Sequence, residues 1–446
     1  MIISILSDFH FGYGWKTELR EDSFDSAKEA IEKSLDSDLI ILAGDIFDNP
    51  LPRTDVWYKS IQILSLPLIE GKSNVKFVKS IGGKNLKKIS SRLFQGIPVV
   101  AIHGTHERRA KGFKNPIEAL EEAGLLIHLH TNGIMVEKDD TRLAIQGMSG
   151  VPERYAKDVL MKWNPKPVDG CFNILLFHQS ISPYVYSKLD PPSLSLDDLP
   201  KGFDLIVDGH IHTRQLKKLN DGYFLIPGST IITQLKKEES ETPKGFYKIV
   251  VEGEKLKHIT FVELENVRKF YYREIEVKKT DVVRDKVKEE VEKILSKEHK
   301  KPPIVRIFLK GDYEILEKEM RELERMYEGK ALLKILKHVE DKEIRSKMET
   351  IQKLKDRKMS VEEIGLSILK ENLKDLKFEN ILDPHYLFNL LSEEDVEKVV
   401  EILVSEQKTL LPVLKKSLLQ QEEAKQEEKK EDAKDTPKGW DRWVKK

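Results

Sequence analysis

Short apolar runs alternate with amphipathic segments from Met1 to about Leu264. The runs at Ile2–Leu6, Leu39–Ala43 and Val99–Ile102 are too short for helices and too apolar for an exposed surface, so they predict buried strands. Between the first two runs, Ser23–Leu35 has the spacing of an amphipathic helix. Buried strands that alternate with helices are typical of a layered α/β sandwich.

Several of the apolar runs end on side chains that can bind a metal ion. The carboxyl ends of strands gather at one edge of an open α/β sheet, so we expect these side chains to converge on one site. The donors are carboxylates and imidazoles without a thiolate, which suits Mn, Fe or Zn in a dinuclear site better than a structural Zn. The residues are Asp8, His10, Asp45, His106, His178, His210 and His212.

A dinuclear site of this kind predicts phosphoester hydrolysis. Two metal ions about 3.5–4 Å apart need a bridging carboxylate, and Asp45 is the natural candidate. Such a pair clamps a phosphoryl group and turns a bound water into a nucleophile. His106 is then free either to donate a proton or to hold the non-bridging phosphate oxygens.

The composition narrows the setting of this chemistry. The formal net charge of the 446 residues is +0, so only a local patch could attract a polyanion. Cys171 is the single cysteine, which excludes an internal disulfide and fits a reducing compartment. No run approaches the roughly 18 apolar residues of a membrane span, and Met1 leads directly into a strand. We therefore expect a cytoplasmic protein without a signal peptide or a membrane segment.

The strand ends carry short motifs in a fixed order: D-x-H, G-D-x-x-D, G-x-H-E, a single His after a strand, and G-H-x-H. In this order they resemble the calcineurin-like metallophosphoesterase family. Within it, SDFHFGYG, AGDIFDNPLPR and IHGTHERR resemble the archaeal double-strand-break repair nucleases of the Mre-eleven and SbcD type. The resemblance implies an α/β fold, a four-layer β-sandwich flanked by helices, with a small α+β capping domain and a helical C-terminus.

The resemblance also implies a role for each residue of the site. Two Mn²⁺ ions per subunit would be bound, with Asp45 as the bridge between them. One ion would be held by Asp8, His10 and His212, and the other by His178 and His210. His106 would be the catalytic histidine, and Asp48 would stand close to it as a second residue of the catalytic group.

Thr105 departs from the family pattern. The family has an Asn here, and its amide oxygen binds a metal. The hydroxyl of Thr105 is a shorter and weaker ligand, so we expect the second ion to be held more loosely or through a water. We do not expect the substitution to change the class of reaction, because the other ligands and His106 are present.

Two segments predict macromolecular partners. The chain from Gly71 to His106 contains no acidic residue, and a basic segment beside a phosphate-cleaving centre favours DNA binding over a merely solvated surface. A helix that begins near Thr54 carries Trp57 and Tyr58, which cannot both lie in one buried stripe. The resemblance implies a homodimer through this helix, and ordinary core packing is the alternative. The candidate DNA contacts are Lys84, Lys87, Lys88, Arg92, Arg108 and Arg109.

We expect four regions along the chain. Residues 1–268 would form the nuclease domain, and residues 269–340 the α+β domain that covers the DNA. The amphipathic helices of residues 341–411 would either dock on a coiled-coil ATPase of the Rad-fifty type, as the resemblance implies, or pack on each other. Residues 412–446 are rich in charge and poor in apolar residues, which predicts disorder.

These expectations together predict a Mn-dependent nuclease that processes DNA double-strand-break ends. By the resemblance it would be a 3′–5′ exonuclease and single-strand endonuclease, and the nuclease subunit of a complex with the ATPase. Two alternatives remain open, namely a phosphodiesterase for a small substrate and a DNA-end tether with weak catalysis. A small substrate would require neither the basic segment nor the C-terminal helices.

Overall fold

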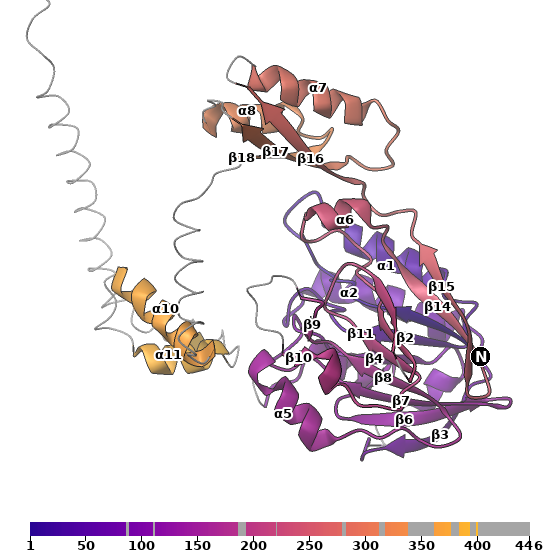
Figure 1. Cartoon of the computed structure of the whole chain (residues 1–446). Coiled ribbons are helices and arrows are strands. Elements are labelled where there is room, and N and C mark those ends of the chain that lie inside the picture. Colours follow the sequence, from indigo (N-terminus) through magenta and orange to yellow (C-terminus); the bar gives the residue numbers. More distant parts are fainter. Residues whose placement is uncertain are drawn as a thin grey trace, which may run out of the picture. The chain divides into compact units, whose positions relative to one another are not determined.

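The computed structural model divides into two compact units, Met1–Glu340 and Asp341–Lys446 (Figure 1). Within the described part of the chain, none of the helices is long and apolar enough to cross a membrane. The structure describes residues 1–85, 89–109, 112–185, 193–219, 221–278, 282–311, 317–337, 361–375, 383–392 and 398–399.

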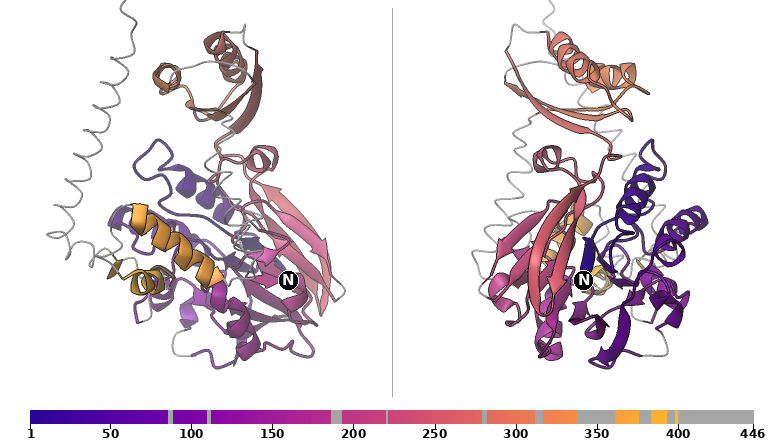
Figure 2. Two further views of the ribbon diagram at one scale, coloured as in Figure 1. Left: turned by 60° about the vertical axis from the view of Figure 1, so that its left-hand side comes forward. Right: turned by 90° about the vertical axis from the view of Figure 1, so that its right-hand side faces the viewer.

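Two β-sheets form the centre of the first unit, and Figure 2 shows them from two further sides. The strand order is β15-β14-β1-β2-β4-β5 in one sheet and β12-β13-β11-β8-β7-β6-β3 in the other. In the first sheet the strands are β1 (Ile2–Leu6), β2 (Leu39–Ala43), β4 (Val99–Ile102), β5 (Ile127–His128), β14 (Gly245–Glu252) and β15 (Lys255–Glu263). In the second they are β3 (Lys76–Ile81), β6 (Asn132–Lys138), β7 (Thr141–Met148), β8 (Phe172–Phe177), β11 (Leu205–Asp208), β12 (Gln215–Lys218) and β13 (Tyr223–Ile226).

Parallel pairing runs through the middle of both sheets. β1, β2, β4 and β5 pair in parallel, and so do β7, β8, β11 and β13. The antiparallel strands lie toward the edges, where β14 pairs with β1 and β6 pairs with β7. Several consecutive strands of each sheet therefore end on the same side, where side chains after different strands can meet.

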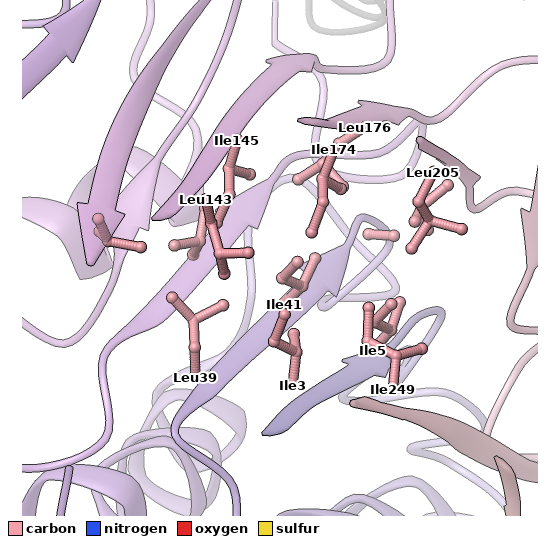
Figure 3. Packing of buried hydrophobic residues seen from close by; sticks show 14 of the residues in the cluster. Ile3, Ile5, Leu39, Ile41, Leu143, Ile145, Ile174, Leu176, Leu205 and Ile249 are labelled. Carbon is pink, nitrogen blue, oxygen red and sulfur yellow. The ribbon is translucent and has the colours of Figure 1, made fainter. Parts of the chain in front are cut away.

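The main core lies between the two sheets. Ile41 of the first sheet and Ile174 of the second are fully buried in it, as Figure 3 shows. The outer face of the first sheet packs against α1 (Asp22–Glu32), α2 (Thr54–Leu64) and α4 (Pro116–Glu122). The outer face of the second sheet packs against α5 (Glu153–Trp163). The predicted four-layer α/β sandwich is confirmed.

A smaller domain with its own core completes the first unit. β16 (Phe270–Val277), β17 (Ile304–Gly311) and β18 (Leu332–Lys337) form a parallel sheet, joined by α7 (Val283–Leu295) and α8 (Glu317–Met326). The sequence analysis expected an α+β domain here without placing its strands. The third strand, β18, has the sequence LLKILK, which is only 6 residues long and lacks the strict alternation of apolar and polar residues that predicts a half-buried strand. We call residues 269–337 the small domain.

The second unit contains a pair of short helices, α10 (Val361–Asp375) and α11 (Pro384–Ser392). Leu369 and Leu373 of α10 share a small core with Leu387 and Leu390 of α11. The described helices therefore bury part of their apolar stripe on each other. Docking on a partner remains a prediction, as do the limits of the four regions. The tail of residues 412–446 lies outside the described residues.

The inter-sheet core generates a first prediction about stability. Ile41→Ala removes buried methyl groups between the two sheets, so we expect the free energy of unfolding to fall by about 2–5 kcal/mol. The control is Leu216→Ala, because Leu216 lies on edge strand β12 and is 44% exposed. Denaturant unfolding followed by circular dichroism measures both. Equal losses in the two variants would contradict the assignment of Ile41 to the central core.

Candidate metal centre

The predicted site residues lie in loops that follow the ends of the parallel strands. The loops after β1, β2 and β4 come from the first sheet, and those after β8 and β11 come from the second. Residues from both sheets meet in three groups whose candidate donor atoms lie within 4.8 Å of one another. The groups are Asp8 with His10 and His212, Asp45 with His178 and His210, and His10 with Asp48 and His106.

The backbone of these loops adopts left-handed conformations. The φ angles are 55° at Asp8, 50° at His10, 47° at Asp45 and 70° at His210. Such conformations cost about 1–2 kcal/mol for residues with a side chain, so surrounding contacts must maintain them. The amides of Asp8 and His10 donate to the carbonyls of Gly44 and Asp45 at 3.0 and 2.9 Å. These hydrogen bonds join the first two loops into one rigid edge.

The first group is built around a buried carboxylate. Asp8 is fully buried, and its two carboxylate oxygens have no hydrogen-bond partner among the described residues. His212 Nε2 lies 3.6 Å from Asp8 Oδ1 and 3.1 Å from His10 Nε2. A buried carboxylate without a hydrogen bond is unfavourable unless a positive charge compensates it. The convergence of its oxygens and two imidazole nitrogens therefore fits a cation.

The second group repeats this arrangement beside it. His178 Nε2 lies 3.1 Å from Asp45 Oδ2, and His178 Nδ1 is 2.8 Å from the carbonyl of Ala43. If Nδ1 carries the proton and donates to this carbonyl, Nε2 is left as the ligand atom, as is usual for metal-binding histidines. The Thr105 hydroxyl donates to Asp45 Oδ2 at 3.3 Å. Thr105 thus touches the residue predicted to bridge the ions, and its own role as a ligand remains a prediction.

His106 and Asp48 lie at the entrance to the two groups. The side chain of His106 is 44% exposed, and its backbone amide donates to Asp45 Oδ1 at 2.9 Å. Asp48 Oδ1 is 3.1 Å from His10 Nδ1, so Asp48 orients this ring from behind. The rings of His10 and His106 pack edge to face at 4.8 Å. His106 is therefore accessible from solvent, whereas the predicted ligands Asp8, His10, Asp45 and His178 are buried.

The electrostatics of the centre are dominated by burial and by the two carboxylates. Burial by itself lowers the pKa of His178, but the charge and hydrogen bond of Asp45, the charge of Asp8 and the Ala43 carbonyl together outweigh it and raise this pKa to about 10. Burial and the neighbouring His178 lower the pKa of His210 to about 3. His210 is thus a neutral ligand at pH 7, while His178 must release a proton before it can bind a metal.

Two buried acids near the centre were missed by the sequence analysis. Glu107 accepts hydrogen bonds from the amides of Phe47 at 2.8 Å and Gly104 at 2.6 Å, which ties the loops after β2 and β4 together. Burial, together with the charge of Asp45, raises its pKa to about 8. Asp208 is also fully buried and accepts from the amide of Gln179 at 3.0 Å. Glu107 could have been found from the sequence, because it is the Glu that ends the third motif, G-x-H-E. No sequence motif pointed to Asp208.

The predicted DNA contacts have mixed outcomes. The prediction for Lys84 is wrong, because this side chain is buried and its ammonium pairs with Glu121 and the carbonyl of His128. Arg92 is exposed on a short 3₁₀ helix, Ser91–Phe94. Arg108 and Arg109 are partly buried, and burial lowers the pKa of Arg108 to about 10. Lys87 and Lys88 lie outside the described residues.

Comparison with known proteins agrees with the geometry. Residues 1–214 match the family model of the calcineurin-like phosphoesterases. This part of the chain is a calcineurin-like phosphoesterase domain. The family's enzymes are metal-dependent phosphoesterases with a dinuclear metal site, and the two adjoining groups of carboxylates and imidazoles have the donor set for one.

Curated relatives of this phosphoesterase carry names that refer to DNA repair. The "DNA double-strand break repair protein Mre11" of Sulfolobus acidocaldarius is 25% identical over 420 residues, covering 89% of this chain and 96% of the relative. The protein of the same name from Methanopyrus kandleri is 25% identical and covers 59% of this chain and 57% of the relative. "Double-strand break repair protein mre-11" of Caenorhabditis elegans is 25% identical over 57% of this chain. The chain spans only 39% of the length of that worm protein.

A glycine beside the second group gives a prediction about metal binding by this phosphoesterase. A Cβ at Gly209 would collide with the carbonyl oxygen of Ala43 and the ring of His178. We expect Gly209→Ala to displace this ring and to reduce the bound metal by at least one ion per chain. The control is Gly253→Ala, where a φ of 58° strains the backbone but a Cβ meets no atom within 4 Å, so that it reports the effect of strain without a collision. Elemental analysis of both proteins after metal loading measures the difference, and equal metal contents would contradict the placement of His178.

Proposed function

We propose that this phosphoesterase is a DNA nuclease that processes double-strand-break ends with two Mn²⁺ ions. The observation that carries the proposal is the pair of adjoining donor groups with the accessible ring of His106 at their entrance. The names of the similar proteins in archaea and in C. elegans support DNA ends as the substrate. The proposal includes the two activities that the family resemblance implies, a 3′–5′ exonuclease and a single-strand endonuclease.

Each residue has a defined part in the proposed reaction. Two divalent cations at these groups would supply a hydroxide nucleophile and neutralise charge on the phosphoryl group. Asp8, His10 and His212 would hold one cation, His178 and His210 the other, and Asp45 would contact both. His106 reaches toward the open side and would donate a proton to the leaving oxygen or hold the phosphate. Asp48 keeps the ring of His10 in its orientation.

Cleavage assays test the proposal. We expect the protein to cut a labelled duplex with an overhang in Mn²⁺ and not in EDTA. His106→Ala should reduce the cleavage rate by about 10²–10⁴-fold while DNA binding is retained, because this residue would move a proton in the reaction. His258→Ala is the control, since this histidine is exposed on β15 and belongs to none of the three donor groups.

The same assay distinguishes the alternatives. Hydrolysis of bis-p-nitrophenyl phosphate without cleavage of DNA would favour a small-substrate phosphodiesterase. DNA binding without hydrolysis in any divalent metal would favour a tether, which Thr105 in place of the family Asn would explain. Either outcome would contradict the nuclease proposal.

We propose a homodimer through α2 and α3 (Leu66–Ile69). Trp57 is partly buried and packs against the core, with its ring centroid 5.0 Å from that of Phe47. Tyr58, by contrast, is 64% exposed, and Ile69 at the end of α3 is 73% exposed. Large exposed apolar side chains on neighbouring helices are typical of protein interfaces.

A charge in this surface should separate the subunits. We expect Ile69→Glu to convert a dimer into a monomer, because a carboxylate would be desolvated in the interface. Met161→Glu is a matched control, since Met161 is 69% exposed on α5. Sedimentation velocity measures the masses. A wild-type monomer at all concentrations would contradict the dimer.

We also propose that a coiled-coil ATPase docks on the second unit. α10 and α11 share a core, yet Tyr386 and Leu391 of α11 are 46% and 43% exposed. Exposed apolar side chains on a short amphipathic helix fit docking along a partner helix.

A further inference from the structure

A buried ion pair lies behind His212 and outside the predicted ligand set. Glu239 of α6 (Lys237–Glu241) and Lys244 are 3% and 5% exposed, with Lys244 Nζ 2.7 Å from Glu239 Oε1. Removing two charges from water costs several kcal/mol per ion unless additional hydrogen bonds compensate. Further hydrogen bonds therefore have to compensate for the burial of Glu239 and Lys244, and these bonds show what the pair holds in place.

Glu239 holds the backbone of residues 233–235. Its Oε2 accepts hydrogen bonds from the amides of Gln234 at 2.7 Å and Leu235 at 2.9 Å, and its Oε1 lies 3.5 Å from the amide of Thr233. Leu235 has a φ of 54°, a left-handed conformation that a leucine rarely adopts. The carboxylate thus stabilises a turn that the backbone alone disfavours.

This turn and the ion pair hold His212 from two sides. The Thr233 hydroxyl lies 2.5 Å from His212 Nδ1, on the side of the ring opposite Asp8 and His10. Lys244 Nζ donates to the His212 carbonyl at 3.0 Å. A hydrogen bond to the far nitrogen of a metal-binding histidine fixes its tautomer and orientation. The contact from Thr233 and the contact from Lys244 therefore both determine where His212 Nε2 points.

The same turn also touches the small domain. Arg306 of β17 donates from Nη1 to the carbonyl of Leu235 at 2.6 Å. The side chain of Leu235 packs in an apolar cluster with Phe270 and Ile304 of the small domain. Residues 233–235 therefore contact both a ligand of the first group and the domain that adjoins it.

We propose that Glu239 is a positioning residue, which through residues 233–235 orients His212 and links its position to the docking of the small domain. It touches neither metal nor substrate, and it acts through Thr233 on one side and through the Leu235 carbonyl on the other. The inference rests on the proposed two-metal site. Its consequence is that a change on β17, which touches no ligand, alters metal binding in the first group.

Calorimetric titration of the full-length, metal-free chain with Mn²⁺ alone tests this inference. We expect Glu239→Gln and Thr233→Val to weaken one of the two binding steps by about tenfold or more and to leave the other step unchanged. We expect Arg306→Met to weaken the same step by about fivefold. The matched control is Arg273→Met, because Arg273 also lies in the small domain but its Nε pairs with Glu290 at 2.8 Å rather than with the Leu235 carbonyl. It should bind Mn²⁺ as the wild type does.

Each outcome decides one part of the inference. Wild-type Mn²⁺ affinity in folded Thr233→Val and Glu239→Gln would overturn the positioning role, and equal affinities for Arg306→Met and Arg273→Met would overturn the link to the small domain. Equal weakening of both steps would indicate a general loss of structure and also overturn it. If Glu239→Gln does not fold, Thr233→Val and Arg306→Met decide. Selective weakening in a chain that cleaves no DNA would sustain this inference while the nuclease proposal fails.

Discussion

Two carboxylates that are buried side by side at the meeting point of the sheets set the main constraint on this structure. Asp8 and Asp45 are at most 1% exposed, and burial together with the charge of Asp45 raises the pKa of Asp8, although the neighbouring His212 and His178 lower it overall. Burial of such charges is tolerated only where positive charge or hydrogen bonds compensate for the lost water. Histidines supply part of this compensation, since against the effect of burial the two carboxylates and the Ala43 carbonyl raise the pKa of His178 to about 10. Divalent cations would supply the rest, which is why the same arrangement is suited to phosphoester chemistry.

The surrounding loops are built to maintain this crowding of charge. Left-handed residues at Asp8, His10 and Asp45 direct their side chains inward, and hydrogen bonds between the loops hold them there. Further acids act from outside the ligand set. Glu107 joins two loops, and Glu239 holds a turn behind His212. Preorganisation of this kind is what a site needs when its geometry must be accurate to fractions of an ångström.

The pattern of the chain predicted a large part of this arrangement. Apolar runs that end on Asp or His were sufficient to predict buried parallel strands and a shared site, because strand ends of one sheet must lie at one edge. The predicted residues do meet in three groups. The pattern was less informative where two different environments of a side chain are compatible with the same local sequence. A lysine in a basic run can be exposed or buried, and Lys84 is buried because Glu121 and the His128 carbonyl lie within its reach.

Local order along the chain is therefore sufficient for the strands that carry the site and for the chemical type of the site, since hydrophobic periodicity and ligand chemistry are properties of near neighbours. Contacts between distant segments had to be seen in three dimensions. His10 and His212 are 202 positions apart and their Nε2 atoms are 3.1 Å apart, and no periodicity encodes such a distance. The sequence likewise does not determine which of Trp57 and Tyr58 packs inward and which is exposed, or that Arg306 contacts the carbonyl of Leu235. Burial and pairing of this kind depend on how whole layers pack, and so they arise only once the sheets have come together.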